Sequence, residues 1–339
     1  MTRTISLLLG TTVALSAATA AQAQELNLYS SRHYETDERL YSDFTDLTGI
    51  TINRIEGNAD ELIARMGAEG ANSPADVFLT VDTSRLQRAA DMGVLQPLEN
   101  ALLEERIPAN LRDDDGMWFG FSQRARIIFY DTERVANPPQ TYLELADPAY
   151  EGMICIRSST NTYNQTLLAA MIENHGEEAA REWAAGIVAN MARDPQGGDT
   201  DQLRGLVSGE CDISVSNTYY MARAIRRDVE ALSAEDRATI GWVFPDQGGN
   251  GAHVNLSGGG IAAHAPNMEA AVAFMEYLAS EQAQEYFSAG NDEYPVVEGV
   301  AIAPSAMELG EFEADDVSLA AVAANLPLAQ QIFNDVGWE

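Results

Sequence analysis

The strongest constraint on the fold is a regular alternation of strand-like and helix-like segments near the start of the chain. Strand-like runs cover 25–30, 50–55 and 74–80, and the segments between them carry apolar residues at helical spacing. Gly49 and Gly93 stand where two of the helices should end. This order predicts an α/β architecture in which helices cover a mostly parallel sheet.

A second group of elements follows one unusually long extended segment, Trp118 to Asp131. Beyond it the pattern predicts strands at 152–157, 211–215 and 240–244 and helices at 164–174, 177–192 and 200–207. A single long helix is predicted over 268–288. Between these elements, the glycine-rich run from Gly248 to Gly260 lacks the strand-then-helix setting that cradles phosphate. We therefore attribute its glycines to hinge flexibility where the chain crosses back.

Two α/β groups joined by two crossing strands predict a hinged, two-lobed clamshell. We expect the first lobe to comprise residues 24–122 and 248–300, and the second lobe to comprise 123–247 and 301–339. Binding between lobes of this kind would take place at the carboxyl edges of the strands.

The first 23 residues have the form of an export signal. Arg3 supplies a positive charge, an apolar stretch follows, and Ala21-Gln22-Ala23 has the small-x-small form of a cleavage site. The apolar stretch is too short and too rich in Ala, Ser and Thr for a good membrane span. The residue immediately after the cleavage site is Gln24 and not a Cys that could take a lipid anchor. We expect cleavage after Ala23 and an exported, soluble chain.

The composition disfavours nucleic acid and anionic membranes as partners. The chain has 20 Lys and Arg against 52 Asp and Glu, a formal net charge of −32. Such a surface repels nucleic acid and anionic lipid. The charge favours solubility and requires no specific partner.

The chain has two cysteines, Cys155 and Cys211, each in a strand-like run. In an oxidising compartment an even pair suggests a disulfide, and neighbouring strands could bring the two together. The alternative is two buried thiols. A redox-active pair is disfavoured because there is no Cys-x-x-Cys sequence.

The adjacent residues Tyr219 and Tyr220 lie at the boundary between a strand-like run and a predicted helix. Neighbouring side chains diverge in a regular strand or helix, so two tyrosines can aim at one point only from an irregular turn. The alternative is that both rings fill a core or form separate hydrogen bonds.

Six stretches carry a resemblance to one protein family: Tyr29-Ser30-Ser31-Arg32-His33-Tyr34, Ser73-Pro74-Ala75-Asp76-Val77-Phe78, Gln123-Arg124-Ala125-Arg126, Asn161-Thr162-Tyr163-Asn164-Gln165, Asn217-Thr218-Tyr219-Tyr220 and His253-Val254-Asn255-Leu256-Ser257-Gly258. They resemble the periplasmic ferric-iron-binding proteins of ABC importers. The resemblance spans nearly the whole predicted mature chain. It is closest to the branch that binds iron mainly through tyrosines, without a synergistic anion.

The resemblance implies a set of iron ligands. Tyr163, Tyr219 and Tyr220 would come from the second lobe and Tyr34 from the first, with His33 as a possible further ligand. It also implies a monomeric periplasmic protein that carries Fe(III) to an ABC permease in the inner membrane. Anion-dependent relatives bind instead through a histidine, a carboxylate and the tyrosine pair. Glu56 and Asn58 lie near the position of that carboxylate.

The chemistry of the metal supports the tyrosine set independently. Fe(III) is small and highly charged and favours anionic oxygen, and a bound trivalent ion can deprotonate a phenol whose pKa is near 10. Four phenolates around one ferric ion carry one excess negative charge. Four arginines are placed by motif to offset that charge: Arg32, Arg124, Arg126 and Arg223. Each could instead be a solvated surface charge, and His175, His253 and His264 lack ligand spacing and are expected to be structural.

Two other functions compete with iron binding. The same fold could hold an organic solute, such as a polyamine or a small anion, between acidic and aromatic side chains. An enzyme such as a metal-dependent hydrolase is disfavoured because the chain has no His-Glu-x-x-His and no Gly-x-Ser-x-Gly sequence. A metal saturated by tyrosines also has no open position for a substrate.

Overall fold

The computed structural model describes residues 24–32, 34 and 36–339, so the predicted export signal and His33 lie outside the described residues. Ten strands form the sheet within this part of the chain: β1 (Glu25–Ser30), β2 (Thr51–Glu56), β3 (Val77–Thr80), β4 (Leu95–Gln96), β5 (Phe119–Asp131), β6 (Ile154–Cys155), β7 (Ile213–Asn217), β8 (Ile240–Val243), β9 (Val254–Ala262) and β10 (Tyr294–Pro295). Their order is β2-β1-β3-β9-β5-β7-β6, with β4 beside β9 and both β8 and β10 beside β5.

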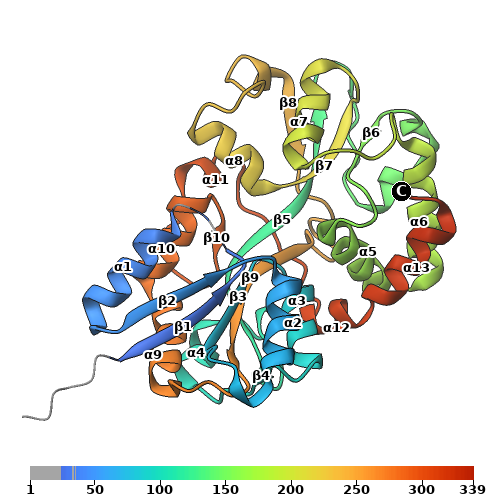
Figure 1. Cartoon of the computed structure of the whole chain (residues 1–339). Helices are drawn as coiled ribbons and strands as arrows, with labels where there is room; N and C mark the ends of the chain where they lie inside the picture. Colours follow the sequence, from blue (N-terminus) through green and yellow to red (C-terminus); the bar gives the residue numbers. More distant parts are fainter. Residues whose placement is uncertain (1–23, 33, 35) are drawn as a thin grey trace, which may run out of the picture.

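The long strand β5 joins two groups of strands (Figure 1). Its first half, through Ala125, pairs with β9, which in turn pairs with β3 and so with the parallel strands β1 and β2. From Arg126 onward it pairs with β7 and then β8. The switch of partners between these neighbouring residues divides the sheet, as expected for a strand that crosses between two α/β groups.

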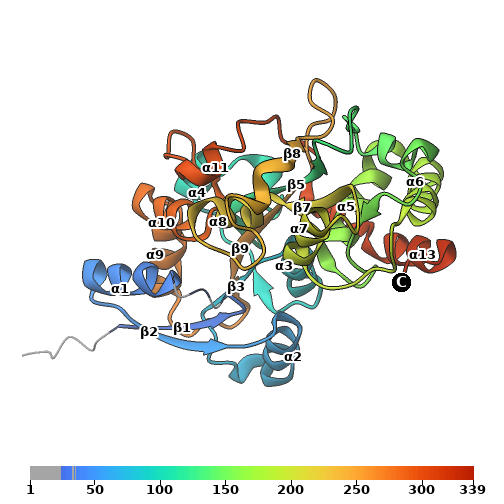
Figure 2. The same ribbon diagram turned by 90° about the horizontal axis from the view of Figure 1, so that it is seen from above.

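Thirteen α-helices cover the two groups of strands in the described residues: α1 (Asp37–Thr48), α2 (Ala59–Glu69), α3 (Thr83–Asp91), α4 (Ala101–Arg106), α5 (Thr162–His175), α6 (Glu177–Asn190), α7 (Asp199–Ser208), α8 (Thr218–Arg226), α9 (Met268–Leu278), α10 (Glu281–Asn291), α11 (Pro304–Met307), α12 (Leu319–Ala324) and α13 (Leu326–Val336). Helix α1 packs against α10, and α13 packs against α5 and α6 at the opposite end of the molecule (Figures 1 and 2). Over the described part of the chain, no helix combines the length and the apolar character that crossing a membrane would require.

The sequence pattern was wrong about two elements. The helix predicted over 268–288 is two helices, because Ser280 caps a new one by accepting a hydrogen bond from the backbone N–H of Ala283. The strand predicted over 152–157 is reduced to Ile154–Cys155. Here the chain pairs only briefly with β7 before it turns toward α5.

Three glycines of the glycine-rich run have a different role from the one predicted. Gly258, Gly259 and Gly260 lie inside the central strand β9, where every residue is buried. A Cβ at any of the three would collide with a backbone carbonyl oxygen of a neighbouring segment, at Gly258 that of Phe119. These glycines therefore permit close packing in the sheet, and hinge flexibility does not explain them.

The two cysteines form the predicted disulfide. Cys155 ends β6 and Cys211 precedes β7, and these two strands are parallel neighbours. The bond joins residues 56 positions apart in the sequence. Strand β7, which follows Cys211, leads directly to Tyr219 and Tyr220.

Candidate metal-binding site

The tyrosine pair lies in the first turn of α8. Strand β7 ends at Asn217, whose backbone is still extended, and the helix begins at Thr218. The two rings stack, with centroids 4.2 Å apart and planes 30° apart. The prediction of an irregular turn was therefore too loose, since the tyrosines belong to a helix that begins immediately after the strand. Both tyrosines therefore start from a helix N-terminus, where the backbone dipole stabilises negative charge.

Tyr163 reaches the same point from a second helix N-terminus. It is the second residue of α5, and its hydroxyl oxygen lies 3.3 Å from that of Tyr219. Tyr219 is buried, whereas Tyr163 and Tyr220 remain partly accessible. Three phenols from two helices thus converge on one small volume.

Tyr34 approaches from the loop between β1 and α1. The guanidinium carbon of Arg32 lies 5.0 Å from the centre of its ring. Burial, with a further contribution from the charge of Glu293 and opposed by Arg32, raises the pKa of Tyr34 to about 12. A Tyr163 phenolate also raises this pKa, which places Tyr34 within electrostatic reach of the group on α5 and α8.

Tyr219 and Tyr220 are also held in their neutral form. Burial raises the pKa of Tyr219 well above its ordinary value of 10, and the phenolates of Tyr163, Tyr220 and Tyr34 raise it further. Burial likewise raises the pKa of Tyr220, and the buried carboxylate of Asp199 adds to the effect. Deprotonation of this cluster at neutral pH therefore requires a cation bound among the oxygens.

All four predicted arginines lie close to the tyrosine rings. Arg124 lies 5.9 Å from the centre of the Tyr163 ring, and Arg223 lies 5.3 Å from that of Tyr219. Arg32, beneath Tyr34, pairs with both Asp37 and Glu293. Glu293 also lies 3.6 Å from Arg124, so one buried carboxylate holds the arginines on both sides of the site.

Arg126 has a structural role beyond the predicted one. It also lies 5.9 Å from the Tyr163 ring, but its charge is paired with the fully buried Asp199 at 3.2 Å. Its guanidinium donates to the side chains of Asn164, which follows Tyr163, and of Asn217, which precedes α8. One ion pair therefore ties together the starts of the two helices that carry the phenols.

Two residues of this network were not predicted from the sequence. Asp199 begins α7, accepts a hydrogen bond from the backbone N–H of Asn217, and lies 3.5 Å from Arg157. Arg157 lies 5.6 Å from the centre of the Tyr163 ring. Its position just beyond the carboxyl end of β6 was the available signal, because ligands bind at that edge of such sheets. No comparable signal marks Asp199 in the sequence.

Glu56 and Asn58, which lie near the carboxylate position of anion-dependent relatives, have other partners, and so does His253. Asn58 caps α2 through the backbone N–H of Asp60, and Glu56 lies 3.2 Å from Arg54. His253 is buried beside Thr166, and burial, with a contribution from Arg126, lowers its pKa to about 3. Within the described residues there is no group of three His, Cys, Asp or Glu side chains placed to hold a metal ion.

The chain is similar to known proteins over nearly its whole length. Residues 72–313 match the family described as bacterial extracellular solute-binding protein. The iron uptake protein A1 of Synechocystis is 49% identical over 325 residues, which cover 95% of this chain and 90% of that protein.

Solved structures give the same result. A Trichodesmium protein described as IdiA or FutA in complex with iron and citrate ligands is 48% identical, with a TM-score of 0.88 over 93% of this chain and 100% of that one. The apo form of FutA2 from Synechocystis is 44% identical, with a TM-score of 0.89 over 94% of this chain and 100% of that one.

Proposed function

The chain belongs to the family of bacterial extracellular solute-binding proteins, and we infer from this membership and from the tyrosine cluster that it binds ferric iron and delivers it to an ABC importer. It is a transport component and not an enzyme. Fe(III) is its transported ligand, and the predicted two-lobed α/β fold is that of its ferric-binding structural relatives.

The observation that carries the proposed site is the convergence of Tyr163 and Tyr219, whose hydroxyl oxygens lie 3.3 Å apart. Tyr220 stacks on Tyr219, and Tyr34 is within electrostatic reach of both Tyr163 and Tyr219. We assign these four phenols as the iron ligands. His33 is a candidate fifth ligand because it precedes Tyr34 in the chain.

The charges around the phenols favour a trivalent ion. Five arginines, including Arg157, lie close to the tyrosine rings. Four of these arginines form ion pairs with three buried carboxylates, which are those of Asp37, Asp199 and Glu293. Among the described residues, no carboxylate forms an ion pair with Arg223. The surroundings therefore carry an excess of positive charge, which offsets the negative charge that four phenolates leave around one Fe(III).

The proposal also includes the lobes and the cellular setting. The first lobe comprises residues 24–122 and 248–300, and the second comprises 123–247 and 301–339. Tyr34 then belongs to the first lobe and the other three phenols to the second, so a bound ion holds the lobes closed. The signal directs export of the chain and is removed by cleavage after Ala23. The mature chain acts in the periplasm as a monomer and docks on an inner-membrane permease.

A visible absorption titration with ferric citrate tests this proposal. Phenolate-to-iron charge transfer is coloured, so the protein should develop a visible band that saturates at one iron per chain. A rival organic ligand, such as a polyamine or a small anion, would leave the protein colourless. A chain that binds no iron and develops no band would refute the proposed function.

A further inference from the structure

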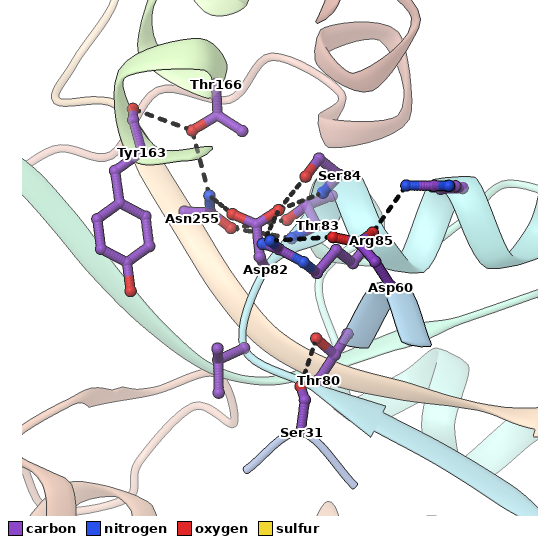
Figure 3. A network of polar contacts seen from close by, with 12 residues as sticks. Ser31, Asp60, Thr80, Asp82, Thr83, Ser84, Arg85, Tyr163, Thr166 and Asn255 are labelled. Atoms are coloured by element: carbon purple, nitrogen blue, oxygen red, sulfur yellow. Dashed lines mark hydrogen bonds and ion pairs between the residues drawn. The ribbon is translucent and has the colours of Figure 1, made fainter. Parts of the chain in front are cut away.

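We propose that the hydroxyl of Thr166 is a hinge latch that holds the closed form and positions Tyr163. The inference rests on the proposed function, since it assigns a further positioning residue to the same site. Thr166 lies on α5 one helical turn after Tyr163, and its hydroxyl contacts the backbone carbonyl oxygen of Tyr163 at 3.2 Å. Figure 3 shows this hydroxyl between Tyr163 and Asn255.

The same hydroxyl also contacts His253 and Asn255, which lie on either side of the first residue of β9. Nε2 of His253 lies 3.3 Å from it, and Nδ2 of Asn255 donates to it over 3.2 Å. Both side chains are buried. Val254, between them, is the first residue of β9.

The hydrogen-bond capacity of Thr166 is filled by these three partners. A hydroxyl has one donor and two acceptor sites. His253 is neutral, and its Nδ1 has no hydrogen-bond partner in the described part of the chain, so the proton belongs on Nε2. Thr166 therefore accepts from His253 and Asn255 and donates to the carbonyl oxygen of Tyr163.

The two nitrogen donors, on His253 and Asn255, belong to different groups of strands, because the chain crosses from one group to the other at the start of β9. The backbone N–H of His253 donates to the hydroxyl of Tyr142, on the side of β5 that pairs with β7 and β8. Asn255 pairs with Arg124 in β5, on the side of β9 and β3. Its amide oxygen accepts from the backbone N–H of Thr83. Its amide nitrogen also donates to Asp82, so that Asn255 is fixed to the start of α3 (Figure 3).

Rotation about this crossing would separate α5 from α3 and break the bond between Thr166 and Asn255. The bond between Thr166 and His253 would survive, because His253 is hydrogen-bonded to Tyr142 and Arg126 and so moves with the second lobe, although it follows the lobe boundary assigned above at residue 248. The Asn255 amide would then bond to water in the open form, so the bond to Thr166 favours the closed form selectively. One net hydrogen bond shifts such an equilibrium by roughly three- to tenfold.

The test compares Thr166→Val with Thr166→Ser, which keeps the hydroxyl. Ser214→Ala is the matched control, because it removes a buried hydroxyl that has no hydrogen-bond partner among the described residues. We would measure the radius of gyration of each metal-free protein by small-angle scattering. Iron affinity, iron release rate and the position of the visible band follow on the same samples.

Thr166→Val should enlarge the metal-free radius, weaken iron binding by roughly three- to tenfold and speed release, with the band position unchanged. Thr166→Ser and Ser214→Ala should behave as the wild type does. If Thr166→Val fails to fold, Thr166→Ala provides the same comparison.

Wild-type radius and affinity in the Val variant would overturn the latch and leave the proposed function intact. A Ser variant that behaves as the Val variant would also overturn it, because packing and not the hydroxyl would then be responsible. If the wild type binds no iron, the proposed function fails, and the metal-free radii still decide whether the latch exists.

Discussion

Replacing Asp199 with Asn should destabilise the protein and loosen the iron site together. The carboxylate is fully buried and lies 3.2 Å from Arg126 and 3.5 Å from Arg157. Asn keeps the volume and one oxygen, which can still accept from the backbone N–H of Asn217. Its NH₂ group, however, would face the guanidinium donors of the arginines, and a buried positive charge would lose its partner.

The expected magnitude follows from this loss. Breaking a buried ion pair by removing one partner costs about 3–5 kcal/mol, and we expect about 3 kcal/mol because the isosteric amide keeps part of the network. The melting temperature should then fall by roughly 6–12 °C, measured by calorimetry on the metal-free protein. Iron affinity should also fall, since Arg126 ties the starts of α5 and α8 together.

The matched control is Asp335→Asn, which removes the same charge from an exposed pair with Arg181 at 2.7 Å. An exposed pair contributes about 0–1 kcal/mol, so its melting temperature should stay close to that of the wild type. An Asp199→Asn protein as stable as this control, with unchanged iron binding, would refute the role we assign to the buried pair.

Three further predictions concern the disulfide, pH and closure. Cys155→Ala/Cys211→Ala should lower the free energy of unfolding by about 4 kcal/mol, as the chain-entropy model gives for a loop of this length, and equal denaturant midpoints would contradict this. Burial holds the pKa of Tyr34 at about 12 and raises that of Tyr219, so these phenols must release their protons when iron binds. Iron affinity should therefore rise with pH and fall toward acid by up to about tenfold per pH unit and phenolate. A flat affinity profile between roughly pH 8 and pH 5 would argue against phenolate ligands. Iron should reduce the radius of gyration, and Tyr34→Phe should weaken this closure more than initial capture; a variant that closes fully would remove Tyr34 from the ligand set.

The elements with strong local patterns could be predicted from the sequence. The β1-α1-β2-α2-β3 alternation, the crossing strand β5 and the cysteine pair all depend on spacing that survives without tertiary contacts. The break at Ser280 was missed because the apolar pattern runs through it, and only the capping bond marks the boundary. The glycines of β9 were misinterpreted for a related reason, since crowding by neighbouring strands cannot be seen in a single sequence.

In the candidate site, too, residues marked by local sequence patterns could be predicted, and those that depend on tertiary contacts could not. Tyr163, Tyr219 and Tyr220 could be singled out because they lie at predicted strand-to-helix boundaries or in recognisable motifs. Asp199 could not, because its importance comes from contacts with residues 73 and 18 positions away along the chain. The position of Arg126 could be predicted from the sequence, but its pairing with that buried carboxylate could not.

The measurement that tests the account most directly is a ferric citrate titration of Tyr219→Phe/Tyr220→Phe, followed by visible absorption and bound iron. The double substitution removes two anionic donors and nearly preserves ring volume, so the protein should fold. Tyr277→Phe is the matched control, because its buried hydroxyl has no hydrogen-bond partner in the described part of the chain. We predict that the control retains the band and the affinity, whereas the double variant loses the band and binds iron more weakly by several orders of magnitude, at about 1.4 kcal/mol for each tenfold. A double variant that keeps its colour and near-normal affinity would contradict the assignment of these tyrosines as iron ligands.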